Sequence, residues 1–216
     1  MNTENMIACP ISFPSTVAIF GKGPSLDLWF QTDLREANGE YRVCINETCQ
    51  IVPGCCMAVG QDQEVMGIFQ SMPANILIMT PDVLAQYVFA FSIRYHMHYG
   101  KVCGGQRYMT TPNAMRFLSK YGVRNFLMVG FDSMHYGKTE FDAWGKDSYS
   151  KIVNSLGHGW SVNDYGGGSY QIIREQILET IKDYNLNVEW FHKSIKSGTV
   201  YDFIKQGDPT DEQTPF

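Results

Sequence analysis

Short apolar runs recur along the chain, and each is followed by a polar or amphipathic stretch. The first run, residues 17–20, lacks the alternation of a half-exposed strand and is typical of a strand buried on both faces of a sheet. The strands predicted from this pattern span residues 17–20, 41–46, 56–60, 75–79, 125–130 and 188–191.

Helix signals occupy several of the stretches between these strands. Threonine followed by proline begins two of them, at Thr80-Pro81 and Thr110-Thr111-Pro112, because threonine is a good N-cap and proline suits the first helical turn. The predicted helices span residues 25–31, 80–95, 110–121 and 169–184. Strands and helices thus alternate, which predicts an α/β, Rossmann-like fold with a mostly parallel sheet and helices on both faces.

The pattern also predicts the domain organisation. At 216 residues the chain suits one well-buried domain, which we expect over residues 16–206. Residues 1–15 contain two prolines and read as an irregular N-terminal arm, and residues 207–216 as a flexible tail. Residues 133–168 are polar, glycine-rich and aromatic, and too long for a simple connection, so we expect a loop or lid there.

Composition narrows the class of protein. Apolar residues make up 44% and charged residues 18% of the chain, as in soluble globular proteins. The net charge of −5 argues against a nucleic-acid partner. We expect no signal peptide and no membrane span, because the N-terminus lacks a basic region and the longest apolar run is too short. Six cysteines without a CxxC pair predict reduced thiols, a cytoplasmic location and no zinc site.

The turn after the first strand is the most distinctive local feature. Gly21-Lys22-Gly23-Pro24-Ser25 joins that strand to a predicted helix, and glycines there let a ligand approach bare backbone. A strand that enters a helix through glycines directs several N–H groups at one place, which suits a phosphate. The turn matches neither GxGxxG nor the P-loop pattern. Phosphate binding and an ordinary strand-to-helix turn both remain open.

Polar residues follow several of the other predicted strands. In open parallel sheets, ligands bind outside the carboxyl ends of the strands at the topological switch point. The residues expected there besides the glycine turn are Asn46, Gln61, Asp62, Thr80, Gly130 and Asp132. Their convergence predicts a ligand site at this edge of the sheet.

Taken together, these stretches resemble the bacterial lipooligosaccharide sialyltransferases and the 6-hydroxymethylpterin pyrophosphokinase-like proteins that share a GxGPSL turn. Residues 21–26 read GKGPSL, a following strand ends at Asn46, and residues 110–132 are similar to the family's Thr-Ser-Gly, helix, strand and G-I-D segment. The resemblance covers roughly residues 16–191. It implies a Rossmann-like fold and a CMP-activated sugar as donor.

The resemblance also implies roles for individual residues. Gly21, Gly23 and Ser25 would hold phosphate, Asn46 would contact the nucleotide, and Thr110 and Thr111 would add donors at a helix start. Gly130 and Asp132, in the segment similar to G-I-D, would lie at the floor of the site. The chain departs from the family in two places. Lys22 replaces an asparagine, which suits a diphosphate or triphosphate at least as well as CMP, and residues 166–169 lack the family's general-base histidine.

Glycosyl transfer needs a base for the acceptor hydroxyl and stabilisation of the leaving phosphate. His158 and His135 are the candidate bases because the pKa of histidine lies near neutrality, and Tyr136 could stabilise the phosphate. Each could equally be a loop residue without a catalytic role. His192 is expected at the surface. No metal is required, although Asp62 and Asp132 could hold Mg²⁺ in an alternative mechanism.

The sequence therefore predicts a glycosyltransferase-like enzyme that uses a nucleotide-sugar donor and needs no other cofactor. A Mg²⁺-dependent diphosphotransferase that uses ATP is the alternative. A domain that binds or sequesters a nucleotide without catalysis is a third reading, which the missing histidine keeps open. The donor sugar, the acceptor and a homo-oligomeric state are left open by the sequence.

Overall fold

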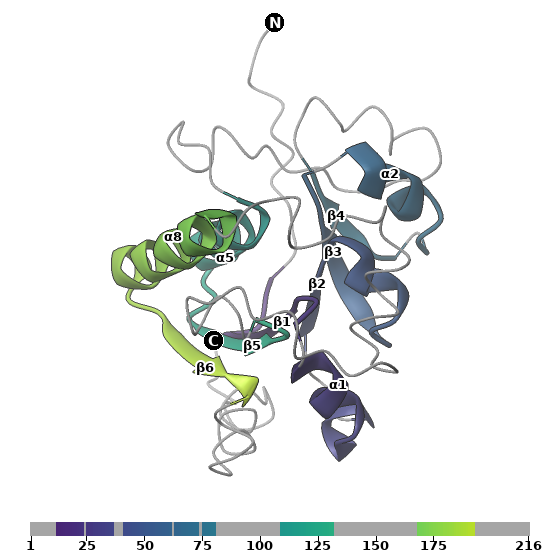
Figure 1. Cartoon of the computed structure of the whole chain (residues 1–216), viewed down its shortest axis with the longest axis horizontal. Coiled ribbons are helices and arrows are strands. Elements are labelled where there is room, and N and C mark those ends of the chain that lie inside the picture. The colour runs from purple at the N-terminus through teal and green to yellow at the C-terminus, as the bar shows by residue number, and fades with distance from the viewer. Residues whose placement is uncertain are drawn as a thin grey trace, which may run out of the picture.

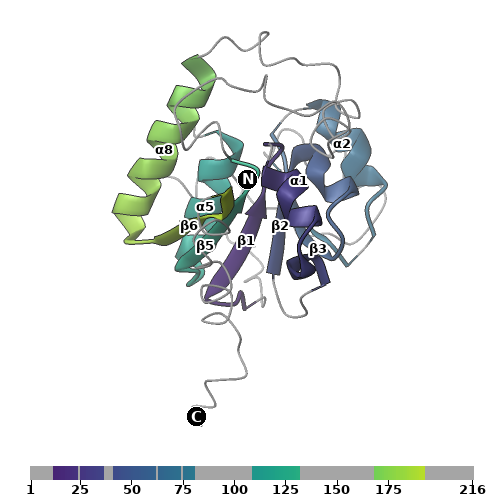
Figure 2. The ribbon, with the colours of Figure 1, turned by 60° about the horizontal axis from the view of Figure 1, so that its bottom comes forward.

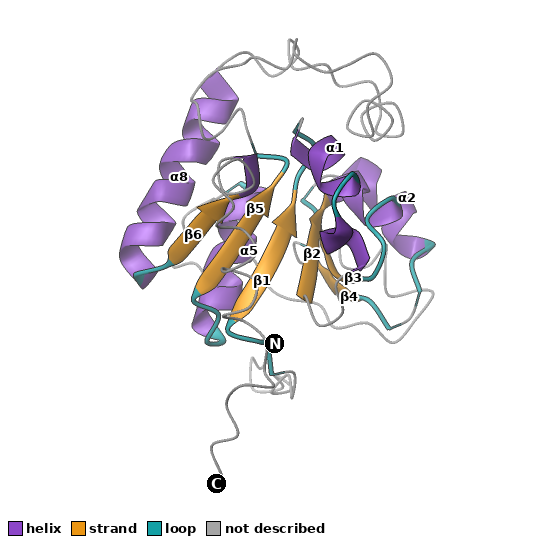
Figure 3. Cartoon of the chain, turned by 90° about the horizontal axis from the view of Figure 1, so that it is seen from below, coloured by secondary structure: helices purple, strands orange, loops and turns teal. Residues whose placement is uncertain are grey.

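A six-stranded parallel sheet organises the described part of the chain. The computed structural model describes residues 12–23, 25–36, 41–61, 63–73, 75–80, 109–131 and 168–192. The strands are β1 (Thr16–Phe20), β2 (Tyr41–Ile45), β3 (Cys55–Val59), β4 (Leu77–Met79), β5 (Asn125–Val129) and β6 (Asn187–Trp190). They pair in the order β4-β3-β2-β1-β5-β6, and every pairing is parallel (Figure 3). The predicted α/β, Rossmann-like class is confirmed.

The central strands are mostly apolar because helices cover both faces of the sheet. Val17 and Ile19 of β1 face one side, whereas Ala18 and Phe20 face the other, and all four are buried. β2 and β5 also bury every residue after their first. Successive strand side chains point to opposite faces, so only a continuous apolar run can satisfy both layers.

One face is covered by the helical segments that follow β1, β2 and β3 (Figure 1). These are α1 (Ser25–Phe30), the 3-10 turns η1 (Asp33–Glu36) and η2 (Asn46–Gln50), and α2 (Gln63–Gln70). The sequence analysis did not predict α2. Its apolar residues Val65, Met66 and Phe69 are buried, but the flanking glutamines and Gly67 obscure the helical period in a segment of this length.

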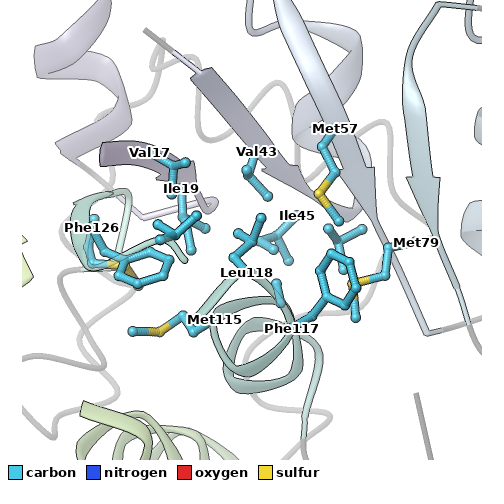
Figure 4. Close-up of a cluster of buried hydrophobic side chains, with 14 of the residues drawn as sticks. Val17, Ile19, Val43, Ile45, Met57, Met79, Met115, Phe117, Leu118 and Phe126 are labelled. Atoms are coloured by element: carbon cyan, nitrogen blue, oxygen red, sulfur yellow. The ribbon is translucent and has the colours of Figure 1, made fainter. Parts of the chain in front are cut away.

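The other face is covered by α5 (Thr110–Lys120) and α8 (Gly168–Tyr184), which lie side by side in Figures 1 and 2. Figure 4 shows the buried cluster in which Met115, Phe117 and Leu118 of α5 face the side chains of the sheet, with Phe117 beside Met79. Arg116 joins the two helices because its guanidinium lies 2.6 Å from a carboxylate oxygen of Asp183.

At the ends of the strands nearest their N-termini, which we call the amino edge, aromatic rings close the sheet. Phe13, just before β1, makes edge-to-face contacts with Tyr41, Phe117 and Tyr121 at centroid distances of 5.5 to 6.0 Å. The opposite ends form the carboxyl edge. All strands are parallel, so their carboxyl ends share this edge, as the predicted site requires.

Several predictions fall outside the described residues and stay predictions. They concern residues 1–11 of the arm, the helix from Pro81 onward, the aromatic loop before Gly168, and the tail. None of the helices that the structure describes has the length and apolar character needed to cross a membrane.

Candidate functional site

The order of the strands reverses at β1 and β5. From β1 the chain moves outward through β2, β3 and β4, and then returns to place β5 on the other side of β1. The helix after β1 covers one face, whereas the helix before β5 covers the other (Figure 2). The β1–β5 pair is therefore the topological switch point, where open parallel sheets bind their ligands.

The glycine turn lies at this switch point and is bound to the end of β5. The backbone N–H groups of Gly21 and Gly23 donate to the carbonyl oxygens of Val129 and Gly130, at 2.8 and 2.7 Å. The N–H of Gly130 donates in turn to the hydroxyl oxygen of Ser25, at 2.9 Å. The N–H groups predicted to hold a phosphate thus have partners within the protein. Their role as phosphate donors stays a prediction that requires these bonds to open.

Contact between two glycines explains why the turn tolerates no larger residue. A Cβ on Gly21 would lie 2.8 Å from the carbonyl oxygen of Gly130, and a Cβ on Gly130 would overlap the carbonyl of Gly21. Gly130 also has a φ of +77°, in the left-handed region that favours glycine. Close packing of the two loops therefore accounts for these glycines without any ligand.

Lys22 is the cationic group of the turn. Its ammonium nitrogen lies 3.1 Å from the carboxylate oxygen Oε2 of Glu47, in η2 at the end of β2. The exposures of the two side chains differ, at 31% for Lys22 and 9% for Glu47. Oε2 is buried and has no well-aligned hydrogen bond from the described residues. The pair is thus a close ion pair in which the carboxylate is buried and the lysine side chain is partly exposed.

Asn46 and Thr48 on either side of Glu47 shape this end of β2. The Thr48 hydroxyl lies 3.1 Å from the carbonyl oxygen of Phe20 and 2.9 Å from that of Ile45, so η2 is fixed against the end of β1. Asn46 has a φ of +54°. Its side-chain oxygen Oδ1 is buried and receives no hydrogen bond from the described part of the chain. A buried acceptor without a donor costs free energy, so this oxygen suits a donor group of a ligand.

The start of α5 lies at the same edge, because α5 runs antiparallel to the strand that follows it. The helix begins at Thr110, and the residue before it, Met109, is the N-cap. The prediction that a threonine caps this helix is therefore wrong. Met109 takes the extended cap conformation, and its N–H donates to Oε1 of Gln176 at 2.9 Å, so α8 anchors the turn. Thr111 is buried and Thr110 is half-buried.

Two other polar residues at the ends of strands are buried. Thr80 follows β4 but is fully buried, and its hydroxyl lies 3.4 Å from the sulfur of Met66. His192 was expected at the surface, but the structure buries it beyond the end of β6. Short polar segments after a strand are often exposed, and sequence alone did not indicate that the chain continues inward there.

The predicted catalytic and metal-binding residues lie outside the described residues. These are His158, His135, Tyr136, Asp62 and Asp132. Within the described ranges, no group of three or more histidine, cysteine, aspartate or glutamate side chains is placed to hold a metal ion. The predicted base and the alternative Mg²⁺ ligands stay predictions.

The four described cysteines are free thiols. Cys44 of β2 and Cys49 of η2 are buried beneath the Lys22–Glu47 pair, in the core cluster against which Cys55 packs. Burial raises the pKa of both thiols well above the ordinary value, and for both the Coulombic effect of Cys55 raises the pKa further. They are neutral core groups at neutral pH, not nucleophiles.

Sequence reasoning missed Glu47. Twenty-five positions separate it from Lys22, so no local motif joins the two. The closeness of Glu47 to Lys22 could be inferred only after β1 and β2 were placed as parallel neighbours, because this pairing brings the residues after both strands to one edge of the sheet.

Comparisons with known proteins add a distant likeness. No protein-family model matches the chain. No curated protein matches it either. A crystal structure of the sialyltransferase CST-II in complex with trisaccharide acceptor and CMP is similar over 82% of this chain and 80% of that one, with 13% sequence identity and a TM-score of 0.43. A likeness at this level identifies neither a family nor a ligand for this chain.

Proposed function

We propose that the carboxyl edge of the sheet binds the phosphate of a nucleotide, and that the protein is a glycosyltransferase-like enzyme with a nucleotide-sugar donor. The observation that carries the proposal is the position of Lys22, a cationic and partly exposed side chain at the β1–β5 switch point. The resemblance of residues 21–26 to the GxGPSL turn supports the choice of a nucleotide sugar.

Lys22 is suited to the leaving phosphate of such a donor. An ammonium group has three N–H donors, and Glu47 lies beside the group without making a well-aligned hydrogen bond to it. Negative charge grows on the phosphate as the glycosidic bond breaks, and a cation fixed at that point stabilises the transition state more than the ground state. The N-terminus of α5 at the same edge would add its positive dipole end.

The remaining chemistry belongs to residues outside the described ranges. In this proposal His158 or His135 takes the proton of the acceptor hydroxyl, and Tyr136 assists the leaving phosphate. Asn46, whose buried Oδ1 receives no hydrogen bond from the described residues, accepts one from the nucleotide. Mg²⁺ is not required by this reaction.

A second function is favoured by the same lysine. A full positive charge at this position suits a diphosphate or triphosphate, which would make the protein a diphosphotransferase acting on ATP with Mg²⁺. Metal dependence separates the two functions.

The test is a thermal-shift screen of CMP, CDP, UDP, GDP, ADP, ATP and their sugar conjugates, each with and without Mg²⁺. A ligand at a hundred times its Kd adds about 2.7 kcal/mol to the free energy of unfolding. We expect stabilisation by a cytidine nucleotide or a nucleotide sugar without metal. Stabilisation by ATP only with Mg²⁺ would favour the diphosphotransferase, and stabilisation by none of them would refute both functions.

The matched variants are Lys22→Met and Lys120→Met. Lys120 is exposed at the amino edge, so it controls for the loss of one positive charge from the whole protein. We expect Lys22→Met to weaken nucleotide binding roughly tenfold, as for the loss of a charge-assisted hydrogen bond. Equal effects of the two substitutions would show that the phosphate does not bind at Lys22. Turnover of the bound nucleotide then distinguishes an enzyme from a binding domain.

A further inference from the structure

Glu47 has an unusual position for a residue next to a phosphate site. A carboxylate repels an anion, yet this one lies 3.1 Å from the ammonium group that would bind it. Its side chain is 9% exposed, and burial of a carboxylate is costly unless a cation or hydrogen bonds compensate for it. Stability alone therefore gives no reason to prefer a charged residue here.

The geometry of the ion pair leaves the Glu47 carboxylate incompletely satisfied by the described residues. Oε2 of Glu47 receives no well-aligned hydrogen bond from the described residues, although Lys22 is close. The neighbouring Oδ1 of Asn46 is also buried without a donor among those residues. Two adjacent residues thus each hold a buried acceptor oxygen without a well-aligned donor among the described residues, and that of Glu47 lies 3.1 Å from the Lys22 nitrogen.

We infer that Glu47 determines which anions bind at Lys22, because its buried carboxylate competes with the phosphate of a ligand for the same ammonium group. A small inorganic anion gains the charge of Lys22 but weakens the only ion pair that Glu47 makes within the described chain. A phosphate ester that carries hydroxyl or amino groups brings its own donors to Asn46 and Glu47. The site therefore favours such an ester over free phosphate or pyrophosphate.

This inference rests on the proposed phosphate site, but inorganic pyrophosphate tests it without a nucleotide. If Glu47 competes with the anion, removing its charge should increase affinity for pyrophosphate, whereas a purely structural role would predict no change or a loss. Glu47→Gln removes the negative charge beside Lys22, which leaves the ammonium group available to a ligand. We therefore expect pyrophosphate to bind this variant roughly tenfold tighter than it binds the wild type. Glu47→Asp retains the charge but shortens the side chain, and about a threefold gain is expected.

A double-mutant cycle shows whether Glu47 acts through Lys22. The Glu47→Gln substitution is repeated in a Lys22→Met protein, and the Kd of pyrophosphate is measured by calorimetry at two salt concentrations. We expect the gain in affinity to disappear in the Lys22→Met background. We also expect a steeper salt dependence for Glu47→Gln than for the wild type, because the exposed cation is no longer neutralised.

Three results would overturn the inference. They are weaker binding of pyrophosphate to Glu47→Gln, an equal change in both backgrounds, and no binding to Glu47→Gln at millimolar pyrophosphate. If Glu47→Gln does not fold, the same pyrophosphate measurements on Glu47→Asp test the inference, and the same three results would overturn it. The proposed function fails separately: tight pyrophosphate binding by Glu47→Gln without any nucleotide binding by the wild type would refute the function and retain the role of Glu47.

Discussion

At the amino edge the strands end against aromatic rings, whereas at the carboxyl edge they end against glycines, a buried carboxylate and an asparagine with positive φ. Phe13 and the rings around it gain dispersion and hydrophobic energy and strain no backbone. At the carboxyl edge, Glu47 carries a cost in desolvation, and Asn46 holds a buried acceptor oxygen that receives no hydrogen bond from the described residues. Costs that cluster at one edge of a sheet point to a site that a ligand completes.

The chain provides chemically matched residues for testing this contrast. Gly130 and Gly122 both have positive φ, and so do Asn46 and Asn185. In each pair the first residue lies at the carboxyl edge and the second in a turn that leads from a helix into the amino end of a strand. Equal effects within a pair would remove the distinction between the edges.

The largest effect is expected for Gly130→Ala. The new Cβ would overlap the carbonyl of Gly21 and would force alanine to a φ of +77°, so we expect a loss of about 3 kcal/mol or more in the free energy of unfolding. A Cβ on Gly122 would have no atom within 4 Å, although its φ is +98°. Gly122→Ala should therefore cost only the backbone strain of alanine at positive φ, about 1 kcal/mol in the free energy of unfolding. Urea denaturation measures both. A loss at Gly130 no greater than at Gly122 would mean that the two loops are not in close contact.

Thr48→Val should have the next largest effect. The valine keeps the shape but removes hydroxyl contacts to carbonyls of two strands, at a cost of about 1 kcal/mol. We expect pyrophosphate affinity to change as well, since η2 positions Glu47 beside Lys22. Thr180→Val is the control, because the hydroxyl of this buried residue donates to the carbonyl oxygen of Gln176 in its own helix and to no other described residue. Retained pyrophosphate affinity in Thr48→Val would show that η2 holds Glu47 without this hydroxyl.

Asn46→Gly distinguishes the backbone cost of positive φ at Asn46 from the contact proposed between its side chain and the nucleotide. Glycine adopts positive φ freely, so about 0.5 kcal/mol of stability should be gained at Asn46 and a similar amount at Asn185→Gly. Only Asn46→Gly should weaken nucleotide binding, because it removes the buried oxygen Oδ1. Thermal denaturation with and without nucleotide measures both effects, and unchanged binding by Asn46→Gly would exclude Asn46 from the site.

The smallest effect is a pH dependence that arises beneath the carboxyl edge. Burial raises the pKa of Cys44 and Cys49, so the folded protein keeps thiol protons that the unfolded chain releases near pH 8.5. The stabilisation is complete at lower pH and is lost as the pH rises. We expect the free energy of unfolding to fall by about 0.3 kcal/mol between pH 7 and pH 8 from these two thiols. Cys44→Ala should halve that fall, and an unchanged slope would mean that water reaches the thiol beneath η2.

The sequence predicted much of the fold because buried parallel strands have a pattern that needs no tertiary information. The run at residues 17–20 became the core of β1, and the predicted strand at 125–130 became β5 with one residue fewer. The short helix α2 was missed, since eight residues with an internal glycine carry little periodic signal. The start of α5 was predicted from a threonine cap. The N-cap is instead Met109, whose backbone N–H donates a hydrogen bond to the side-chain oxygen Oε1 of Gln176 in α8.

The candidate site was predicted only in part, because its defining contact joins residues distant in sequence. Lys22 and Asn46 were identified from the strands that precede them. Glu47 was not, because a glutamate in a polar segment is ordinarily exposed and its burial depends on η2 folding back over β1. The N–H groups of Gly21 and Gly23, which a ligand had been expected to occupy, instead donate to carbonyl oxygens at the end of β5, a contact that also joins residues distant in sequence.

The place of β1 at the centre of the sheet has a consequence for how the chain folds during synthesis. β1 is the first described strand to emerge from the ribosome, and most of the residues that cover its Ala18 and Phe20 face follow before residue 80. The face that carries Val17 and Ile19 must wait for α5, β5 and α8. A nascent chain that ends before residue 110 lacks all the described helices that cover this apolar face, and incompletely covered sheets are the kind of intermediate that chaperones protect.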